Sequence, residues 1–424
     1  MRVPVIPRLR MNALTVIFVI ALALSAALRA WLTGRQIHHV HGHRGTVPAV
    51  FAASVGAEQH QKAADYTVAK CRFSLLGTAL EPVLALLWTL GGGLTLLDST
   101  WRNLRLDMLT AGVAVIGSYV LINALIELPL GAYATFGIEA HFGFNRTTLK
   151  TYVLDRLKML MLGALLGVPL LYAVLFLMQR TDRLWWLYAW LLWLAFSLLI
   201  TWAWPVLIAP LFNKFAPLAD AELKQRIEAL VTRCGFTSRG VFVMDGSARS
   251  AHGNAYFTGL GRHKRIVFFD TLMDKLAADE IEAVLAHELG HFRLHHVAQR
   301  LWVSAVLSLA GLAVLGWLTS QPWFYAGLGV HLPSAHMALL LFTLLAPPFL
   351  LLLEPASSAW SRRHEFQADA YAASQVNGSA LAHALVKLYR DNASTLTPDP
   401  LHSAFHDSHP PALARITALQ APTR

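Results

Sequence analysis

The sequence predicts a mainly α-helical protein that crosses a membrane about seven times and carries a small α+β domain. Hydrophobic residues make up 55% of the 424 residues, charged residues only 14%, and the mean hydropathy is +0.47. Apolar stretches close to the roughly 20-residue length that crosses a bilayer recur along the chain. Two segments of mixed, soluble-like composition, 209–300 and 354–424, interrupt this pattern.

Seven apolar stretches are nearly free of charged residues: 12–28, 73–97, 108–126, 159–178, 184–208, 301–319 and 337–353. One such stretch can be a buried core helix, but seven in one chain predict a polytopic membrane protein. The first stretch follows Arg2, Arg8 and Arg10, which also fits a cleavable signal peptide. Arg29 and Trp31 at its far end favour a retained membrane anchor.

Basic residues between the stretches predict the orientation in the membrane. With the N-terminus outside, the loops 29–72 and 131–158 face the cytoplasm and hold ten Lys or Arg, against seven on the opposite side. We therefore expect 209–300 and the C-terminus in the cytoplasm. The net charge of +10 is explained by these flanks, and the basic residues form no stripe with interleaved aromatics, so no nucleic-acid partner is expected.

The pattern divides the chain into four consecutive parts. These are five spans in 1–208, a catalytic domain at 209–300, two spans in 301–353, and a C-terminal catalytic part at 354–424. Within the catalytic domain we expect helices at 219–234 and 279–299 and strands at 240–244 and 266–269. Acidic residues open the second helix, where the helix dipole favours negative charge.

The motif His287-Glu288-Leu289-Gly290-His291 lies on this second predicted helix. Residues four apart on a helix lie on one face, one above the other. Both imidazoles can therefore reach one tetrahedral zinc, and Glu288 can hold the water that the metal activates. The motif predicts a zinc peptidase with Glu288 as the general base.

A catalytic zinc keeps three protein ligands and an open position. A metzincin would have Gly at 294 and His at 297, but those positions hold Leu294 and Val297. His295 and His296 are off the ligand spacing. We interpret them as histidines at the C-terminal end of the helix, where the dipole favours positive charge.

Only Glu354 and Glu365 are glutamates that follow the motif. Glu354 precedes Pro355 at the end of an apolar stretch, which indicates an anchoring or kink role. Asp369 follows Glu365 by four residues and shares its helical face, where it can accept the free N–H of a ligating histidine. We expect Glu365 as the third ligand, as in gluzincins, and Asp369 as its support.

Other potential ligands are less organised. A histidine-rich tract contains His38, His39, His41 and His43. No carboxylate or fixed helical spacing accompanies these histidines, so we interpret the tract as a solvated loop. Cys71 and Cys234 lie far apart and indicate neither a disulfide framework nor a cysteine metal site.

Several further motifs make the chain resemble the type I CAAX prenyl endopeptidases, membrane zinc proteases that trim prenylated proteins in eukaryotes and have many bacterial members. These motifs are ELP at 127–129, FGFN at 142–145, PLFNKF at 210–215, NAYFTG at 254–259, EFQAD at 365–369 and SHP at 408–410. With HELGH they cover the chain nearly end to end. The preference for Arg over Lys, with many Ala and Leu, is typical of a GC-rich bacterial genome and predicts a bacterial inner-membrane protein.

The resemblance implies seven membrane helices around a water-filled intramembrane chamber, with the zinc site near its cytoplasmic side. It implies that Asn254, with Ala255 and Tyr256, lies on a strand that aligns the substrate, and peptide addition to a sheet edge is a known recognition mode. It also implies that His409 and Arg415 line the site and stabilise the oxyanion. Bacteria largely lack prenylated CAAX proteins, so the eukaryotic substrate does not transfer directly.

The predicted function is peptide-bond hydrolysis in membrane-associated protein substrates, with one Zn²⁺ per chain and membrane lipid as the surroundings. An HtpX-like quality-control protease is one alternative, although that family is shorter and has fewer membrane segments. A transporter or a non-catalytic scaffold is another, because Glu81 and Glu127 lie within membrane stretches. Neither a transporter nor a scaffold needs an intact zinc motif with its separate Glu and Asp.

Overall fold

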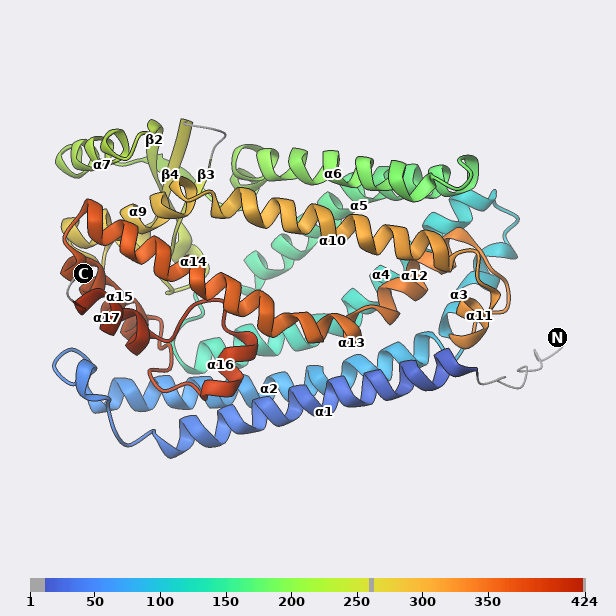
Figure 1. Cartoon of the computed structure of the whole chain (residues 1–424), viewed down its shortest axis with the longest axis horizontal. Helices are drawn as coiled ribbons and strands as arrows, with labels where there is room; N and C mark the ends of the chain where they lie inside the picture. The colour runs from blue at the N-terminus through green and yellow to red at the C-terminus, as the bar shows by residue number, and fades with distance from the viewer. Residues whose placement is uncertain (1–11, 259–262, 422–424) are drawn as a thin grey trace.

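The computed structural model describes residues 12–258 and 263–421 (Figure 1). Within them, seven helical segments are long and apolar enough to cross a membrane, as predicted. They are Ala13–Gly42 (α1), Ala57–Trp88 (α2), Met108–Glu139 (including α4, Met108–Tyr133), Leu149–Arg180 (α5), Trp185–Leu211 (including α6, Trp185–Ala203), His296–Leu318 (α10) and Ala335–Gln375. The last comprises α12 (Ala335–Leu345), α13 (Pro347–Leu350) and α14 (Glu354–Gln375).

Two predicted boundaries were wrong. The expected loop 29–72 shrinks to 43–56, because α1 continues to Gly42 and α2 begins at Ala57. The expected span 73–97 is interrupted, because α2 ends at Trp88 and a separate helix, α3 (Gly93–Arg102), follows. Gly92 precedes α3 as its N-cap and adopts a left-handed conformation with φ 78°, which glycine reaches without steric cost.

The long helices form the walls of an elongated molecule (Figure 1). Helices α1 and α2 lie side by side, and α10 packs against α6. Helices α3 and α11 (Pro322–Gly327) lie at one end, and the sheet with α7 and α9 lies at the other. A cavity of about 320 Å³ between the membrane helices is lined by Glu81, Asn123 and Glu127.

A four-stranded sheet forms the centre of the catalytic part. Its order is β1-β2-β4-β3, with β2 and β4 parallel and the other two pairs antiparallel. The strands are β1 (Phe215–Pro217), β2 (Thr237–Met244), β3 (Ala255–Thr258) and β4 (His263–Phe269). The residue pattern predicted β2 and β4, and the family resemblance implied a strand at the start of β3, but β1 was not predicted. β3 pairs only with β4 among the described residues, so its other side is an open edge.

Three helices enclose the core beside this sheet. They are α7 (Ala221–Arg233), α9 (Ala278–Arg293) and α15 (Gly378–Asp391), and α9 contacts both of the others as well as α14. The fully buried side chains of Ile227, Ile281 and Leu285 belong to this core. The motif helix α9 is therefore held on three sides, which fixes the face that carries its histidines.

The predicted continuous helix 279–299 was also wrong. α9 ends at Arg293, and the membrane helix α10 begins at His296. Between them His295 has φ 60°, a left-handed conformation that is uncommon for a residue other than glycine. The chain changes direction at this single residue, so the motif helix and the sixth membrane span are separate helices.

Candidate metal centre

Helix α9 carries His287 and His291 one turn apart. Glu280 caps the start of the helix, because its Oε2 accepts the backbone N–H of Ala277 at 2.8 Å. Lys387 Nζ from α15 binds the same oxygen at 2.7 Å. The cap and the buried apolar face orient the helix so that both histidines face α14.

Gly290, between the two histidines, lets α9 approach α14 closely. A Cβ atom at this position would lie 3.1 Å from the Cα atom and 3.2 Å from the carbonyl oxygen of Ala368. Both are backbone atoms of α14, so they cannot move aside as a side chain can. The glycine of the motif therefore sets the distance between the helix with two candidate ligands and the helix with the third.

Three ligand side chains meet between these helices and form the metal triangle. His287 Nε2 lies 3.2 Å from His291 Nε2. Glu365 lies 3.4 Å from each nitrogen, with Oε2 toward His287 and Oε1 toward His291. Among the described residues, His287, His291 and Glu365 are the one group of three or more His, Cys, Asp or Glu arranged to hold a metal ion. The predicted ligands thus come together in space.

The dimensions of this triangle fit zinc. Zinc–ligand distances of about 2.0–2.1 Å place two ligands of a tetrahedral ion about 3.3–3.4 Å apart. The distance between the two nitrogens, 3.2 Å, and the distance from each nitrogen to its nearer Glu365 oxygen, 3.4 Å, both agree with this spacing. Glu365 Oε2 is buried and has no hydrogen-bond partner among the described residues, although a buried polar atom normally has one. A bound metal ion would satisfy that oxygen.

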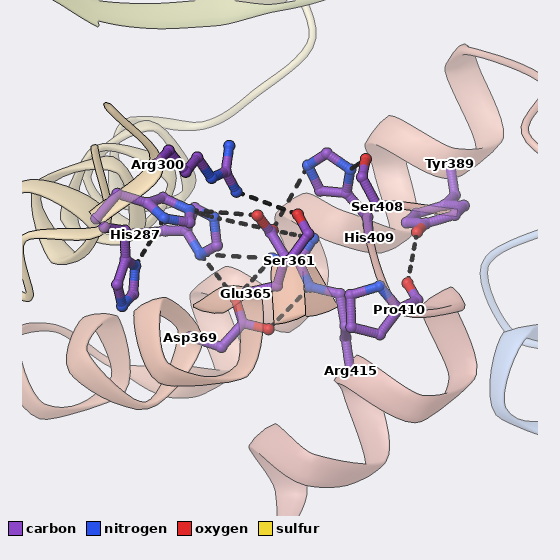
Figure 2. A network of polar contacts seen from close by, with 12 residues as sticks. His287, Arg300, Ser361, Glu365, Asp369, Tyr389, Ser408, His409, Pro410 and Arg415 are labelled. Atoms are coloured by element: carbon purple, nitrogen blue, oxygen red, sulfur yellow. Dashed lines mark hydrogen bonds and ion pairs between the residues drawn. The ribbon is translucent and has the colours of Figure 1, made fainter. Parts of the chain in front are cut away.

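Asp369 and Arg415 support the triangle from behind. Asp369 Oδ1 lies 2.8 Å from His287 Nδ1, so it accepts the N–H that a ligand through Nε2 retains. Arg415 donates to both oxygens of Asp369, from Nε at 2.8 Å and from Nη2 at 2.6 Å. Figure 2 shows these side chains converging from α14 and α17 (Ala412–Gln420).

The local electrostatics favour a cation. Burial alone would lower the pKa of His287, but the carboxylates of Asp369 and Glu365 outweigh it and raise the pKa to about 9. A dication at Nε2 would be stabilised by the same two carboxylates. Burial raises the pKa of Glu288, which makes it a stronger base than an exposed glutamate.

A cleft of about 340 Å³ leads to the triangle. His287, Glu288 and Glu365 line it together with Asn254 and Ala255. The open edge of β3 therefore begins beside the candidate ligands, where a peptide can add to the sheet.

Comparison with known proteins decides the family. Two family models match, one described as the CAAX prenyl protease N-terminal part with five membrane helices (36–214) and the other as peptidase family M48 (217–423). CAAX prenyl protease 1 of Saccharomyces cerevisiae is 33% identical over 421 residues, which cover 93% of this chain and 92% of that protein. The chain belongs to the M48 family of CAAX prenyl proteases.

The likeness extends over the whole fold of this M48 peptidase. The CAAX prenyl protease 1 homolog of Mus musculus is 30% identical, with 95% of each chain covered. The crystal structure of S. mikatae Ste24p superposes with a TM-score of 0.88 at 32% identity, covering 97% of this chain and 99% of that one. The chain is thus a multi-pass membrane metallopeptidase.

Tyr256 in this M48 peptidase lies away from the cleft that Asn254 and Ala255 line. Tyr256 lines a separate cavity of about 880 Å³, together with Tyr152 of α5 and Trp204 after α6. The sequence grouped Asn254, Ala255 and Tyr256 as one substrate-binding set, but the structure places Tyr256 in a different cavity from the other two.

His409 and Arg415 approach the triangle to different degrees. The side chain of His409 is 61% exposed, and its Nε2 lies 3.6 Å from Glu365 Oε2. Arg415 is buried, and its Nη1 lies 3.7 Å from the same oxygen. The pairing of Arg415 with Asp369 is a supporting contact that sequence reasoning missed.

His296 was also misinterpreted from the sequence. It is the first residue of α10, not part of the last turn of α9, and it is buried. Its Nδ1 lies 3.0 Å from His291 Nδ1, and its Nε2 lies 3.0 Å from Gln367 Oε1. Its offset of five residues from His291 does not match helical spacing, so no sequence pattern connects the two histidines.

The remaining candidates have structural surroundings. Glu354 pairs with Arg29 Nη2 at 3.0 Å and with His406 Nδ1 at 3.3 Å, in agreement with an anchoring role. The histidine tract is not a loop as expected, because α1 continues through Gly42. Cys71 and Cys234 are free cysteines.

Proposed function

We propose that the chain is a zinc-dependent endopeptidase that hydrolyses CAAX-type, membrane-associated protein substrates. The observation that carries the proposal is the triangle of His287, His291 and Glu365, whose edges of 3.2–3.4 Å match tetrahedral zinc beside an open strand edge. The relatives' printed names, CAAX prenyl proteases, support the substrate class.

Glu288 is the group that moves the proton. Zinc, when bound, lowers the pKa of a water and polarises the scissile carbonyl. Glu288 is next to the ligand His287 and lines the same cleft, so its carboxylate can accept the water proton and return it to the leaving amine. The burial that raises its pKa also brings that pKa closer to neutrality, where such a base works best.

The edge of β3 orients the substrate in this proposal. Asn392 holds the start of the strand, because its Oδ1 accepts the N–H of Gly253 at 3.1 Å and its Nδ2 donates to the same residue's carbonyl at 3.4 Å. The neighbouring Asn254 faces the cleft with Ala255. A peptide paired with this edge would pass the candidate ligands in an extended conformation.

His409 and Arg415 are the donors for the oxyanion. The exposed side chain of His409 lines the cleft, and Nη1 of Arg415 is the one nitrogen of its guanidinium that does not bind Asp369. Donors that are fixed before the reaction stabilise the charge that develops on the carbonyl oxygen. We propose that His409 is the principal donor, since Arg415 is already engaged.

We propose that the catalytic part faces the cytoplasm. The catalytic part and α3 lie at opposite ends of the long helices (Figure 1). The excess of Lys and Arg in the segments near the catalytic end supports a cytoplasmic active site. In a bacterial host this corresponds to the inner membrane.

The test compares the wild type with Glu288→Gln in detergent. The substrates are a prenylated CAAX peptide, its unprenylated twin and an unfolded soluble protein, with zinc content measured in parallel. We expect one zinc in both proteins and cleavage by the wild type alone. Glu282→Gln is the matched control, because Glu282 lies on the same helix but pairs with Arg226 away from the cleft.

The substrate pattern separates the alternatives. Cleavage restricted to the prenylated peptide supports a lipid-peptide processing enzyme, whereas cleavage of all three substrates indicates a quality-control protease of the HtpX kind. Wild-type rates in Glu288→Gln would refute the assignment of the base. Bound zinc without cleavage of any substrate would favour a non-catalytic scaffold.

A further inference from the structure

His296 connects the sixth membrane span to a candidate zinc ligand. His291, His296 and Gln367 form a chain of contacts, with 3.0 Å between the two Nδ1 atoms and 3.0 Å from His296 Nε2 to Gln367 Oε1. The three residues come from α9, α10 and α14. The contacts therefore join three helices behind the metal triangle.

The contacts allow one arrangement of protons if His291 binds zinc. His291 uses Nε2 toward the other ligands, so its Nδ1 carries the proton of the neutral ring. His296 Nδ1 must then accept a hydrogen bond from that N–H, and His296 Nε2 must carry the proton of its own ring and donate a hydrogen bond to Gln367 Oε1. Resting on the proposed zinc site, we infer that His296 is a positioning residue that holds His291 in its metal-binding tautomer and orientation.

The ring of His296 is itself locked in place. His364 of α14 stacks on it with a centroid distance of 3.9 Å and an interplanar angle of 5°, and Trp360 packs edge-on against His364. Both histidines are 2% exposed, so neither ring turns toward water. A ligand is best oriented by a partner that cannot rotate, and this stack meets that requirement.

The left-handed residue His295 explains how His296 reaches His291. A helix continued past Arg293 would place residue 296 five positions beyond His291, on a different face. The turn at His295, with φ 60°, instead brings the first residue of α10 back against the ligand. Backbone strain of this kind persists where the surrounding structure requires it.

The test measures zinc affinity rather than turnover. His296→Phe keeps a flat ring for the stack but removes the acceptor at Nδ1. His296→Asn places its side-chain oxygen near the position of Nδ1, and His296→Gln places its polar atoms near that of Nε2. His295→Gly is the matched control, because it removes the neighbouring imidazole and suits the left-handed backbone.

Zinc content under competition with a chromophoric chelator, and the visible spectrum of the cobalt-substituted protein, provide the readouts. We expect His296→Phe to weaken zinc binding about 10- to 100-fold, the range for losing such a partner. His296→Asn should recover most of that loss, His296→Gln should not, and His295→Gly should bind as the wild type does.

Three outcomes would overturn the inference. Wild-type affinity and an unchanged cobalt spectrum in His296→Phe would show that the contact has no effect on the metal. Equal losses in the Asn and Gln variants would show that ring volume matters and the acceptor does not, and this comparison holds even if the Phe variant fails to fold. If the wild type binds no zinc, or if His291→Ala binds as much zinc as the wild type, the proposed metal site itself is refuted.

Discussion

Gly290→Ala separates two opposing effects at the metal centre. Alanine is favoured over glycine in a helix interior by about 1 kcal/mol, so on propensity alone the variant gains stability. Its Cβ atom would lie 3.1–3.2 Å from the backbone of Ala368, closer than ordinary van der Waals contact at about 3.5–4.0 Å. Relief requires that α14 move away from α9 by roughly 0.3–0.5 Å.

That movement matters because Glu365 lies on α14, one turn before Ala368. Metal–ligand distances tolerate only about 0.2 Å, so a shift of roughly 0.4 Å stretches the bond to Glu365 beyond its range. Overpacking of this kind costs about 1–3 kcal/mol. We therefore expect Gly290→Ala to bind zinc more weakly and to unfold at a lower temperature.

Thermal unfolding in detergent and chelator-driven zinc loss measure the two consequences. Gly163→Ala on α5 is the control, because a Cβ atom there has no neighbour within 4 Å and adds helix propensity alone. A Gly290→Ala protein that is more stable than the wild type and keeps its zinc would refute the argument, since propensity would then outweigh the contact.

Three further expectations follow from particular contacts. Arg415→Met removes the buried cation that pairs with Asp369, and we expect a loss of about 3–5 kcal/mol in thermal or denaturant unfolding. Asn392→Leu frees the backbone at the start of β3, so KM should rise while zinc content stays constant. Burial alone would raise the pKa of Asp399, but its bonds to Arg35 and the backbone lower it. The stability that this carboxylate adds is thus present above its usual pKa of about 3.9 and lost as the pH falls through the lowered value, so wild type and Asp399→Asn should differ at pH 7 and converge in acid.

The sequence predicted the features that depend on local spacing. His287 and His291 lie four apart on one helix, and Glu365 and Asp369 repeat the same offset on another, so the face of each pair follows from helical geometry. The membrane spans were predicted because each is a continuous apolar stretch. Their ends were predicted poorly where polar or charged residues continue a helix, as between Arg29 and Gly42.

The features that depend on a single backbone angle or on long-range contacts were missed. Only the conformation of His295 separates α9 from α10, and histidine does not signal a left-handed residue as glycine would. The pairing of Arg415 with Asp369 joins α17 to α14 across 46 positions. β1 has three residues, too few for an alternating pattern to be visible, and β3 was indicated only by the family resemblance.

Both helices that carry the ligands are closely linked to membrane spans. α14 belongs to the segment Ala335–Gln375, and α9 is followed directly by α10 at His295. Arg300 Nη2 binds Ser361 Oγ at 3.1 Å and His296 binds Gln367. With the stack of His364 on His296, these hydrogen bonds hold α10 to α14 beside the triangle. The spacing of the sixth and seventh spans thus contributes to the spacing of the ligands.

This coupling predicts the order of events on heating in detergent. A small separation of α10 from α14 opens the triangle without unfolding any helix, so zinc should leave before the helical signal in far-ultraviolet circular dichroism decreases. In a lipid bilayer whose hydrocarbon thickness matches the length of the membrane spans, both transitions should move to higher temperature than in detergent. The temperature of zinc release should rise more than the temperature at which helix is lost. Zinc release that coincides with helix unfolding in both environments would mean that the catalytic part holds the ligands by itself.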